Sequence, residues 1–282
     1  MIIDYENIAK ELSLKENDIL LIAGDLTRLA WHEVSLGKRF DAKAFIHSFK
    51  EQLPAGTLLF HAFNDNLVSG DTFDYIKSKP NTGSLSVAAW KDSDCVRTQD
   101  PFHSFMVWGD ASASLKQRDD PSTFGSNSIF AWLHHNNAKM LIIDLPLVQS
   151  FTFVHYCEEQ LNVLYRKHVK HHIRYIDENG VESVKKRLFF TRKSGYSNYL
   201  DDLETRLIDN GIIRMYDFNN ASFMLVDLPQ SYNFIVNNIY PLNNLVLYKF
   251  DYKNWLKDKL RKLLKTPNSA LRSFDKMLIY FK

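Results

Sequence analysis

The chain has 282 residues, of which 45% are hydrophobic and 24% charged, so it can bury a sizeable core. Its formal net charge of +2 is too close to neutral to favour a nucleic-acid partner. The only two cysteines, Cys95 and Cys157, form no paired-cysteine motif, which supports neither a disulfide framework nor a zinc ribbon and indicates a reducing compartment.

Nothing in the sequence resembles a targeting or membrane-spanning segment. The start, MIIDYENIAK, carries two acidic residues and lacks the basic region and apolar run of a signal peptide. The most apolar stretch, MLIIDLPLV, is short and contains Asp144 and Pro146, so it is interpreted as a buried strand. We expect a soluble, cytoplasmic protein that forms a single domain over residues 1–282.

Helices and strands alternate in the first part of the chain. DYENIAKELSL predicts a helix, and the continuous apolar run Ile19 to Ala23 is typical of a strand buried on both faces. DAKAFIHSFKEQL predicts a second helix that ends before Pro54, and GTLLFHAF predicts a second buried strand. This strand–helix–strand order favours a layered α/β architecture.

The middle of the chain is dominated by turn residues. Residues 64–128 are rich in Gly, Pro, Ser, Asp and Asn, which predicts short elements and loops of the kind that build binding sites. SNSIFAWLHHNNA then predicts a helix capped by Ser126 or Asn127, and KMLIIDL a third buried strand. Whatever follows this strand lies at its carboxyl end, where ligands gather in open α/β sheets.

The stretch that follows, TFVHYCEEQ, contains a candidate catalytic pair. His155 and Glu158 are three residues apart and would share one face of a helix, with Thr152 capping its start. Glu158 would bond one imidazole nitrogen and leave the other free to take a proton, as a general base requires. Cys157 and Glu159 are offset from this face, so we expect no nucleophilic role for Cys157 and a solvated Glu159.

The second half of the chain has different patterns. IRYIDENGVESVKKRLFFTR predicts a β-hairpin around Glu178-Asn179-Gly180, and SNYLDDLETRLIDNG a helix ended by Asn210-Gly211. IIRMYDFNNASFMLVDL predicts two short strands around an Asn-Asn turn.

The C-terminal region is basic and amphipathic, and predicts helices over about residues 251–282. Its apolar face comprises Trp255, Leu256, Leu260, Leu263 and Leu264. The region is interpreted as a docked helix with a solvated cationic side. Weak attraction to an anionic membrane surface or to phosphorylated ligands is the alternative.

Three histidines, His168, His171 and His172, are spaced as metal ligands on a helix would be. No acidic partner is close in sequence and the stretch resembles the start of a strand, so no metal is predicted. The alternative is a basic surface for phosphates, formed with the neighbouring Arg166, Lys167, Lys170 and Arg174.

TFVHYCEE resembles the T-x-x-H-x-x-E element of the aminoglycoside 3-N-acetyltransferase family, also called antibiotic N-acetyltransferases. GTLLFHAF is similar to its G-T-L strand, SKPNTGSLS to its S-x-P-x-x-G segment and VRTQDPFHSFMVWG to R-S-x-H-P-x-x-S-F-x-x-x-G. FGSNSIFAWL resembles F-G-x-x-S-x-x-x-x-L, and LYRKHV matches a Tyr-Arg pair after the catalytic helix. The segments occur in the family's order and cover about residues 15–170.

The resemblance implies a three-layer α/β/α sandwich with a central mixed, largely parallel sheet and a β-hairpin or small antiparallel section in the second half. It also implies acyl transfer from coenzyme A to the amine of an amino sugar. His155 would deprotonate the amine, Glu158 would orient and polarise His155, and Thr152 would hold the helix start and contact the thioester. The amine would attack the thioester directly, without an acyl-enzyme.

The resemblance further implies residues that line the two substrates. Those for acyl-CoA are Gly24, Asp25, Thr27, Arg97, Thr98 and Ser104. Those for the amino sugar are Asp65, Asp100, Tyr165 and Arg166.

Two loops depart from the family pattern. IAGDL, residues 22–26, stands where the family has V-H-S-S-L, and Thr98 and Asp100 replace the serine and the histidine of R-S-x-H-P. We therefore favour a nucleotide-linked amino sugar of surface-polysaccharide assembly as acceptor, since nearby basic residues would suit phosphates. The alternatives are an aminoglycoside, a polycation that Asp side chains could hold, and a non-catalytic binding or scaffold protein on the same fold.

Overall fold

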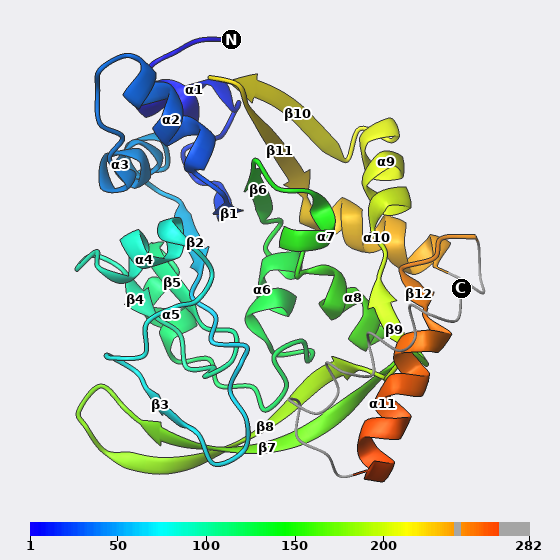
Figure 1. Ribbon diagram of the computed structural model, residues 1–282. Helices are drawn as coiled ribbons and strands as arrows, with labels where there is room; N and C mark the ends of the chain where they lie inside the picture. The colour runs from blue at the N-terminus through cyan, green and yellow to red at the C-terminus, as the bar shows by residue number, and fades with distance from the viewer. Residues whose placement is uncertain (240–243, 265–282) are drawn as a thin grey trace.

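Three buried parallel strands form the centre of the main sheet in the computed structural model, which describes residues 1–239 and 244–264. β1 (Ile19–Gly24) lies between β2 (Thr57–His61) and β6 (Lys139–Ile143) and is parallel to both (Figure 1). Their continuous apolar runs are explained by helices on both faces of the sheet. The three strands predicted from these runs are confirmed.

Antiparallel strands extend the sheet to seven, in the order β10-β11-β6-β1-β2-β5-β4. β11 (Ala221–Asp227) pairs with β6 and with β10 (Ile213–Phe218), and the predicted turn of two asparagines joins β10 to β11 with both residues at positive φ. On the other side, β5 (Phe105–Gly109) pairs with β2 and with β4 (Val96–Arg97). The sheet is mixed, as expected, but it is not largely parallel, because four of its six strand pairings are antiparallel and the parallel ones are confined to the three central strands.

Two layers of helices cover the sheet and produce the expected α/β/α sandwich (Figure 1). Side chains alternate along β1, so that Leu20 and Ile22 face one layer and Leu21 and Ala23 face the other. The first layer contains η1 (Tyr5–Asn7), α1 (Ile8–Glu11), α2 (Thr27–Ser35), α3 (Ala42–Gln52) and α4 (Ser84–Trp90). The second contains α5 (Ser112–Lys116), α6 (Ile129–His135), α7 (Leu147–Ser150), α8 (Val154–Gln160), α9 (Asp201–Asp209) and α10 (Leu228–Asn238).

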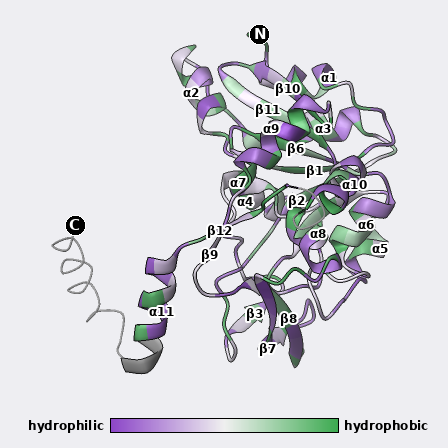
Figure 2. Ribbon diagram, turned by 90° about the vertical axis from the view of Figure 1, so that its right-hand side faces the viewer, coloured by the Kyte–Doolittle hydropathy of each residue, from purple (hydrophilic) through white to green (hydrophobic). Residues whose placement is uncertain are grey.

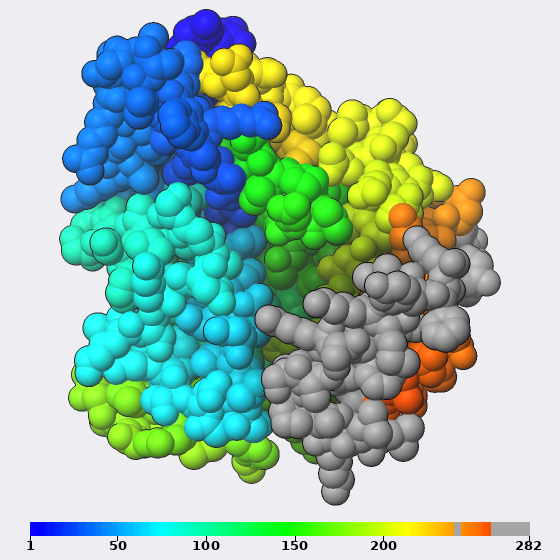
Figure 3. Space-filling view, viewed as in Figure 1, coloured from blue at the N-terminus to red at the C-terminus, as the bar shows by residue number. Residues whose placement is uncertain are grey.

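A long hairpin forms a second, smaller sheet, as predicted. β7 (Arg166–Ile176) and β8 (Glu182–Arg192) pair along their whole length, and β3 (Thr72–Asp74) adds a parallel strand beside β7. In the space-filling view the hairpin forms the lower edge of the molecule, beneath the loop-rich segment that contains β3 (Figure 3). Ile173 and Tyr175 pack there in a separate small core.

The C-terminal helix α11 (Tyr252–Leu264) projects from the body (Figure 2). It follows β12 (Tyr248–Phe250), which pairs with β9 (Tyr196–Asn198). Of the predicted apolar face, Leu256 is 41% exposed. The predicted continuation over 265–282 lies outside the described residues. Within the ranges that the structure describes, no helix is long and apolar enough to cross a membrane.

The N-cap of helix α6 lies two residues beyond Ser126 and one beyond Asn127, the two expected caps. Its N-cap is Ser128, whose Oγ accepts a hydrogen bond from the Ala131 backbone N–H at 3.1 Å. The prediction of Ser126 or Asn127 is therefore wrong. The Asp120 carboxylate accepts the Asn127 backbone N–H at 3.1 Å, which keeps Asn127 in the preceding turn.

Gly24 of β1 leaves no room for a side chain beside Ile143 of β6. Replacing it by alanine is expected to lower the free energy of unfolding by about 1–3 kcal/mol. The new Cβ would lie 2.5 Å from both the Cβ and the backbone oxygen of Ile143, which is its partner in the strand register. Denaturant unfolding of the Gly24→Ala variant measures the loss. An unchanged unfolding midpoint would contradict this packing.

Candidate active site

The side chains of His155 and Glu158 meet on one face of α8. Val154, Tyr156 and Cys157 anchor the helix in the main core. This leaves the other face of α8 to carry the pair, and His155 Nδ1 lies 2.7 Å from Glu158 Oε2. The spacing of three residues therefore produces the contact that it predicts.

Of two residues close to the pair in sequence, Thr152 departs from its predicted role and Cys157 agrees with it. Thr152 was expected to cap α8, but the N-cap is Phe153 and no side chain caps the helix. Thr152 contributes only its backbone oxygen, which accepts the His155 N–H at 3.0 Å, so the predicted cap is wrong. Cys157 is fully buried, and burial raises the pKa of its thiol well above the ordinary value. The thiol is therefore unsuited to nucleophilic attack, as expected.

The Glu158 carboxylate is held from several sides. The Tyr165 hydroxyl donates to Oε1 at 2.8 Å, and Arg166 Nε lies 2.6 Å from Oε2. Glu158 is only 1% exposed, and burial alone would raise the pKa of its carboxyl. His155, Arg166 and the Tyr165 hydrogen bond outweigh burial and lower that pKa. Glu158 is therefore an anion, which accepts hydrogen bonds and donates none.

Arg166 bridges the pair to two neighbouring strands. Its Nε–H is not aligned for a hydrogen bond with Glu158, so their contact is an ion pair. One terminal nitrogen donates to the Phe190 backbone oxygen at 3.2 Å. The other donates to Asn198 Oδ1 at 3.0 Å and lies 2.9 Å from His155 Nδ1 and 3.3 Å from Nε2. The guanidinium thus orients both members of the pair.

The proton of a neutral His155 belongs on Nδ1. A carboxylate only accepts, so Nδ1–H donates to Glu158 and the lone pair remains on Nε2. Burial, followed by the charge of Arg166, lowers the pKa of His155, although Glu158 opposes the shift. The imidazole is 17% exposed. The imidazole is therefore neutral at pH 7, and a small part of it remains exposed.

A loop that precedes α6 packs against the same helix. The edge of the Phe124 ring faces His155, with ring centroids 5.6 Å apart, and Gln160 Nε2 donates to the Phe124 backbone oxygen at 3.0 Å. Ser122 Oγ donates to Glu159 Oε1 at 2.7 Å, and His168 lies 3.2 Å from the same carboxylate. The expectation of a solvated Glu159 is wrong, because this loop and β7 cover it.

Arg97, Thr98 and Ser104, predicted to contact acyl-CoA, are buried. Every N–H of the Arg97 guanidinium faces a protein acceptor. Ser104 Oγ donates to the Ala62 backbone oxygen at 2.7 Å, and Thr98 Oγ1 accepts the Phe105 N–H at 2.9 Å. In this arrangement these side chains position the surrounding loops, and Arg97 has no donor left for a phosphate.

The other three predicted acyl-CoA residues lie at the carboxyl end of β1. Asp25 Oδ1 accepts hydrogen bonds from the Thr27 N–H at 2.9 Å and from the Thr27 hydroxyl at 2.5 Å. Both side chains are exposed. Gly24 ends the strand beside them, so these residues are accessible to a ligand at the edge where one is expected.

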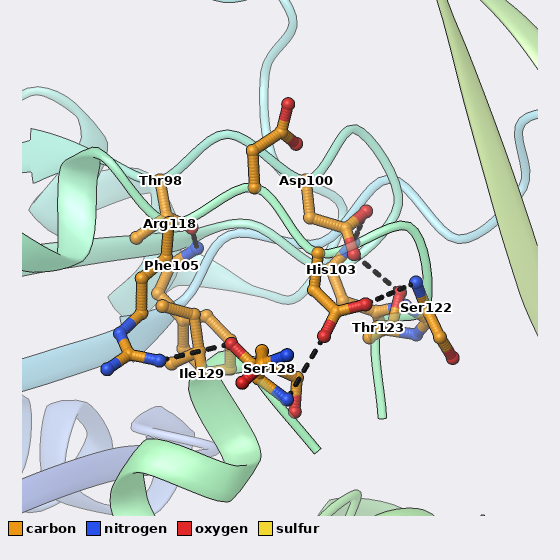
Figure 4. Close-up of a pocket in the computed structure, with 12 residues that line it drawn as sticks. Thr98, Asp100, His103, Phe105, Arg118, Ser122, Thr123, Ser128 and Ile129 are labelled. Atoms are coloured by element: carbon orange, nitrogen blue, oxygen red, sulfur yellow. Dashed lines mark hydrogen bonds between the residues drawn. The ribbon is translucent and has the colours of Figure 1, made fainter. Parts of the chain in front are cut away.

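The predicted sugar-binding residues separate into two groups. Tyr165 and Arg166 contact Glu158 and so belong to the site of the pair. Asp65 is exposed and accepts a hydrogen bond from Asn81 at 2.9 Å. Asp100 faces a small cavity together with His103 and accepts the Thr123 hydroxyl at 2.5 Å (Figure 4). The described contacts of Asp65 and Asp100 do not include His155.

The three spaced histidines lie on β7, so the strand interpretation is confirmed. His168 contacts Glu159, whereas His171 packs against Phe102. His172 is exposed and belongs to the same face of the strand as His168. Within residues 1–239 and 244–264, no three His, Cys, Asp or Glu side chains gather in a metal-binding group.

Sequence reasoning did not find Asn198, Phe124 or Arg192 near the base. Asn198 has no recognisable motif, and Phe124 was noted only as part of a helix start. Arg192 lies directly opposite Arg166 in the hairpin. The predicted turn around Asn179 places Arg192 opposite Arg166, because the turn of a hairpin fixes which residues of its two strands face each other.

A family model and several solved structures match this chain. A family model described as aminoglycoside 3-N-acetyltransferase matches residues 28–239. The solved structure of AAC-IIIb with CoASH has a TM-score of 0.67 at 18% identity and covers 84% of this chain and 96% of its own. Aminoglycoside acetyltransferase AAC(3)-Xa has a TM-score of 0.70 at 16% identity, covering 86% and 95%. YokD from Bacillus subtilis has a TM-score of 0.69 at 15% identity, covering 83% and 96%. A search of curated protein sequences finds no match.

Proposed function

Because the chain belongs to the aminoglycoside 3-N-acetyltransferase family, we propose that it transfers an acyl group from an acyl-CoA thioester to the amine of an amino sugar. The family is one of N-acetyltransferases, and the chain is an enzyme of this class. One structure of this fold, that of AAC-IIIb, contains CoASH, which supports acyl-CoA as the second substrate here.

The contact of His155 with Glu158 is the observation that carries this proposal. A sugar ammonium must lose its proton before it can attack, and the lone pair on His155 Nε2, 3.3 Å from a terminal nitrogen of Arg166, would accept it. The imidazolium that forms is stabilised by the Glu158 carboxylate 2.7 Å away. Tyr165 and Arg166 hold that carboxylate in place during the transfer.

The steps that follow conserve atoms and charge. The neutral amine attacks the thioester carbonyl carbon, and the C–S bond breaks as the tetrahedral intermediate collapses. The departing thiolate takes the proton from His155 Nε2, and the attacking nitrogen loses its remaining extra proton to water, which leaves an amide, free CoASH, a neutral imidazole and one proton in solution. A direct attack is consistent with the burial of Cys157 on the core side of α8.

For the acceptor, we favour a nucleotide-linked amino sugar of surface-polysaccharide assembly. The charge around the base supports this choice, because Arg166 touches His155 and the charge of Arg192 reaches it. Repulsion by these cations disfavours a polycationic acceptor. An aminoglycoside is the second candidate, because another structure of this fold, AAC-VIa, is bound to sisomicin. A non-catalytic scaffold is the third, and the altered loop at residues 22–26 is the reason to keep it.

Thiol release from acetyl-CoA tests the proposal. The protein is mixed with acetyl-CoA and with single acceptors, both nucleotide-linked amino sugars and aminoglycosides, and reactions without acceptor measure hydrolysis. We expect acceptor-dependent release that is faster with the nucleotide-linked sugars. Faster release with aminoglycosides would favour the second candidate. No release with any acceptor or acyl chain would favour the scaffold.

A further inference from the structure

The end of the β7–β8 hairpin brings a second arginine to the base. Arg192 is the last residue of β8 and lies directly opposite Arg166. Side chains of directly opposite residues leave the same face of a ribbon, with Cβ atoms about 4.5–5.5 Å apart. Since Arg166 contacts His155, Arg192 stands at the rim of the same site. Figure 1 shows this end of the hairpin beside β9, to which Arg166 is bonded through Asn198.

The charge of Arg192 is left unbalanced. Arg166 is buried and paired with Glu158, whereas Arg192 is exposed and forms no ion pair within the described part of the chain. The two carboxylates of α8 are already engaged, Glu158 by Arg166 and Glu159 by Ser122 and His168. Directly opposite like charges repel, so an anion beside Arg192 would relieve an unfavourable contact.

The charge of Arg192 also reaches the imidazole. After burial and Arg166, it contributes to the lowering of the His155 pKa. The exposed face of the hairpin also carries Lys170 and Lys186, and most of the ribbon there is coloured hydrophilic (Figure 2). A negatively charged ligand that approaches His155 therefore meets a positive surface that includes Arg192.

We propose that Arg192 binds the diphosphate of a substrate whose reacting group lies at His155. The inference rests on the proposed function, since acyl-CoA and a nucleotide-linked amino sugar both carry a diphosphate. The planar guanidinium offers paired N–H donors that match phosphate oxygens. The same charge repels the ammonium groups of a polycationic sugar, so Arg192 selects between the two classes of acceptor as well.

Binding measurements test the site independently of turnover. Calorimetry follows CoA and, separately, thymidine diphosphate binding to the wild type, Arg192→Ala, Arg192→Lys and Lys186→Ala. Lys186 is a matched control, because it is an exposed cation on the same strand and face but about 20 Å further along. We expect Arg192→Ala to lower the affinity for one of the two ligands by about 10- to 100-fold. Arg192→Lys should lower that affinity less, and Lys186→Ala should leave it unchanged.

The ligand whose affinity falls in Arg192→Ala identifies which substrate carries the diphosphate that Arg192 binds. Loss of CoA affinity assigns Arg192 to the acyl donor, and loss of thymidine diphosphate affinity assigns it to the acceptor. The proposal is overturned if neither affinity depends on Arg192, or if Lys186→Ala causes an equal loss. A wild type that binds through Arg192 but releases no thiol rejects acyl transfer and leaves the diphosphate site standing. An active enzyme indifferent to Arg192 rejects only the site.

Discussion

Replacing His155 with alanine is expected to lower kcat/KM for acyl transfer by about 10²–10⁴-fold. The variant loses the lone pair on Nε2 that accepts the amine proton, while Glu158 keeps its bonds to Tyr165 and Arg166. Initial rates of thiol release over a range of acceptor concentrations measure kcat/KM. His172→Ala is the control, because His172 is an exposed histidine of β7 outside the site. Release at the wild-type rate in His155→Ala would reject the assigned base.

The pH profile provides an independent check on the same residue. Burial and then Arg166 lower the pKa of His155 below its ordinary value of about 6.5. The base works in its unprotonated form, so kcat/KM rises with pH and reaches its plateau with a midpoint below about 6.5. His155→Ala should lose this limb of the profile. A midpoint above 6.5 would mean that Glu158 dominates the environment of the imidazole.

Replacing Glu158 with alanine is expected to lower the free energy of unfolding by about 3–5 kcal/mol. The change leaves the guanidinium of Arg166 and the hydroxyl of Tyr165 buried without their acceptor. Glu158→Gln keeps the shape and part of the hydrogen bonding, so its loss should be smaller. It should still lower kcat, because a neutral amide stabilises the imidazolium less well than a carboxylate.

Denaturant unfolding of both Glu158 variants measures these losses. Glu182→Gln is the control, because it removes an exposed ion pair with Arg174 at 3.6 Å and should cost less than about 1 kcal/mol. The folded-state pKa of Glu158 is lowered, so its contribution is present above the unfolded pKa of about 4.3 and is lost as pH falls further. Equal losses in Glu158→Ala and Glu182→Gln would contradict a buried ion-pair network.

Local patterns predicted the elements whose signal is itself local. β1, β2 and β6 are apolar runs, and the β7–β8 hairpin follows from its turn. The strand partners beyond the three parallel strands were not predictable in the same way. β4 and β5 lie within a segment of turn residues, and their antiparallel place beside β2 depends on packing between distant segments.

The wrong predictions for single residues also arise from contacts between segments that are distant in the sequence. The cap of α6 moved to Ser128 because the Asp120 carboxylate holds Asn127, and Glu159 is covered because a loop and β7 reach it. Neither Asp120 nor Ser122 forms a recognisable motif with the residue that it affects. A carboxylate can be placed on a helix face from sequence, but what covers that face cannot.

The sequence by itself determined that His155 and Glu158 meet, because residues three apart on a helix lie on the same face. His155 and Glu158 accordingly lie 2.7 Å apart. Only the tertiary structure decided how their charges are balanced. In the folded chain Arg97 donates to protein acceptors and Arg166 is paired with Glu158, whereas Arg192 is exposed and has no ion pair among the residues that the structure describes. The energy of a charge depends on its burial and its neighbours, and both come from distant parts of the chain.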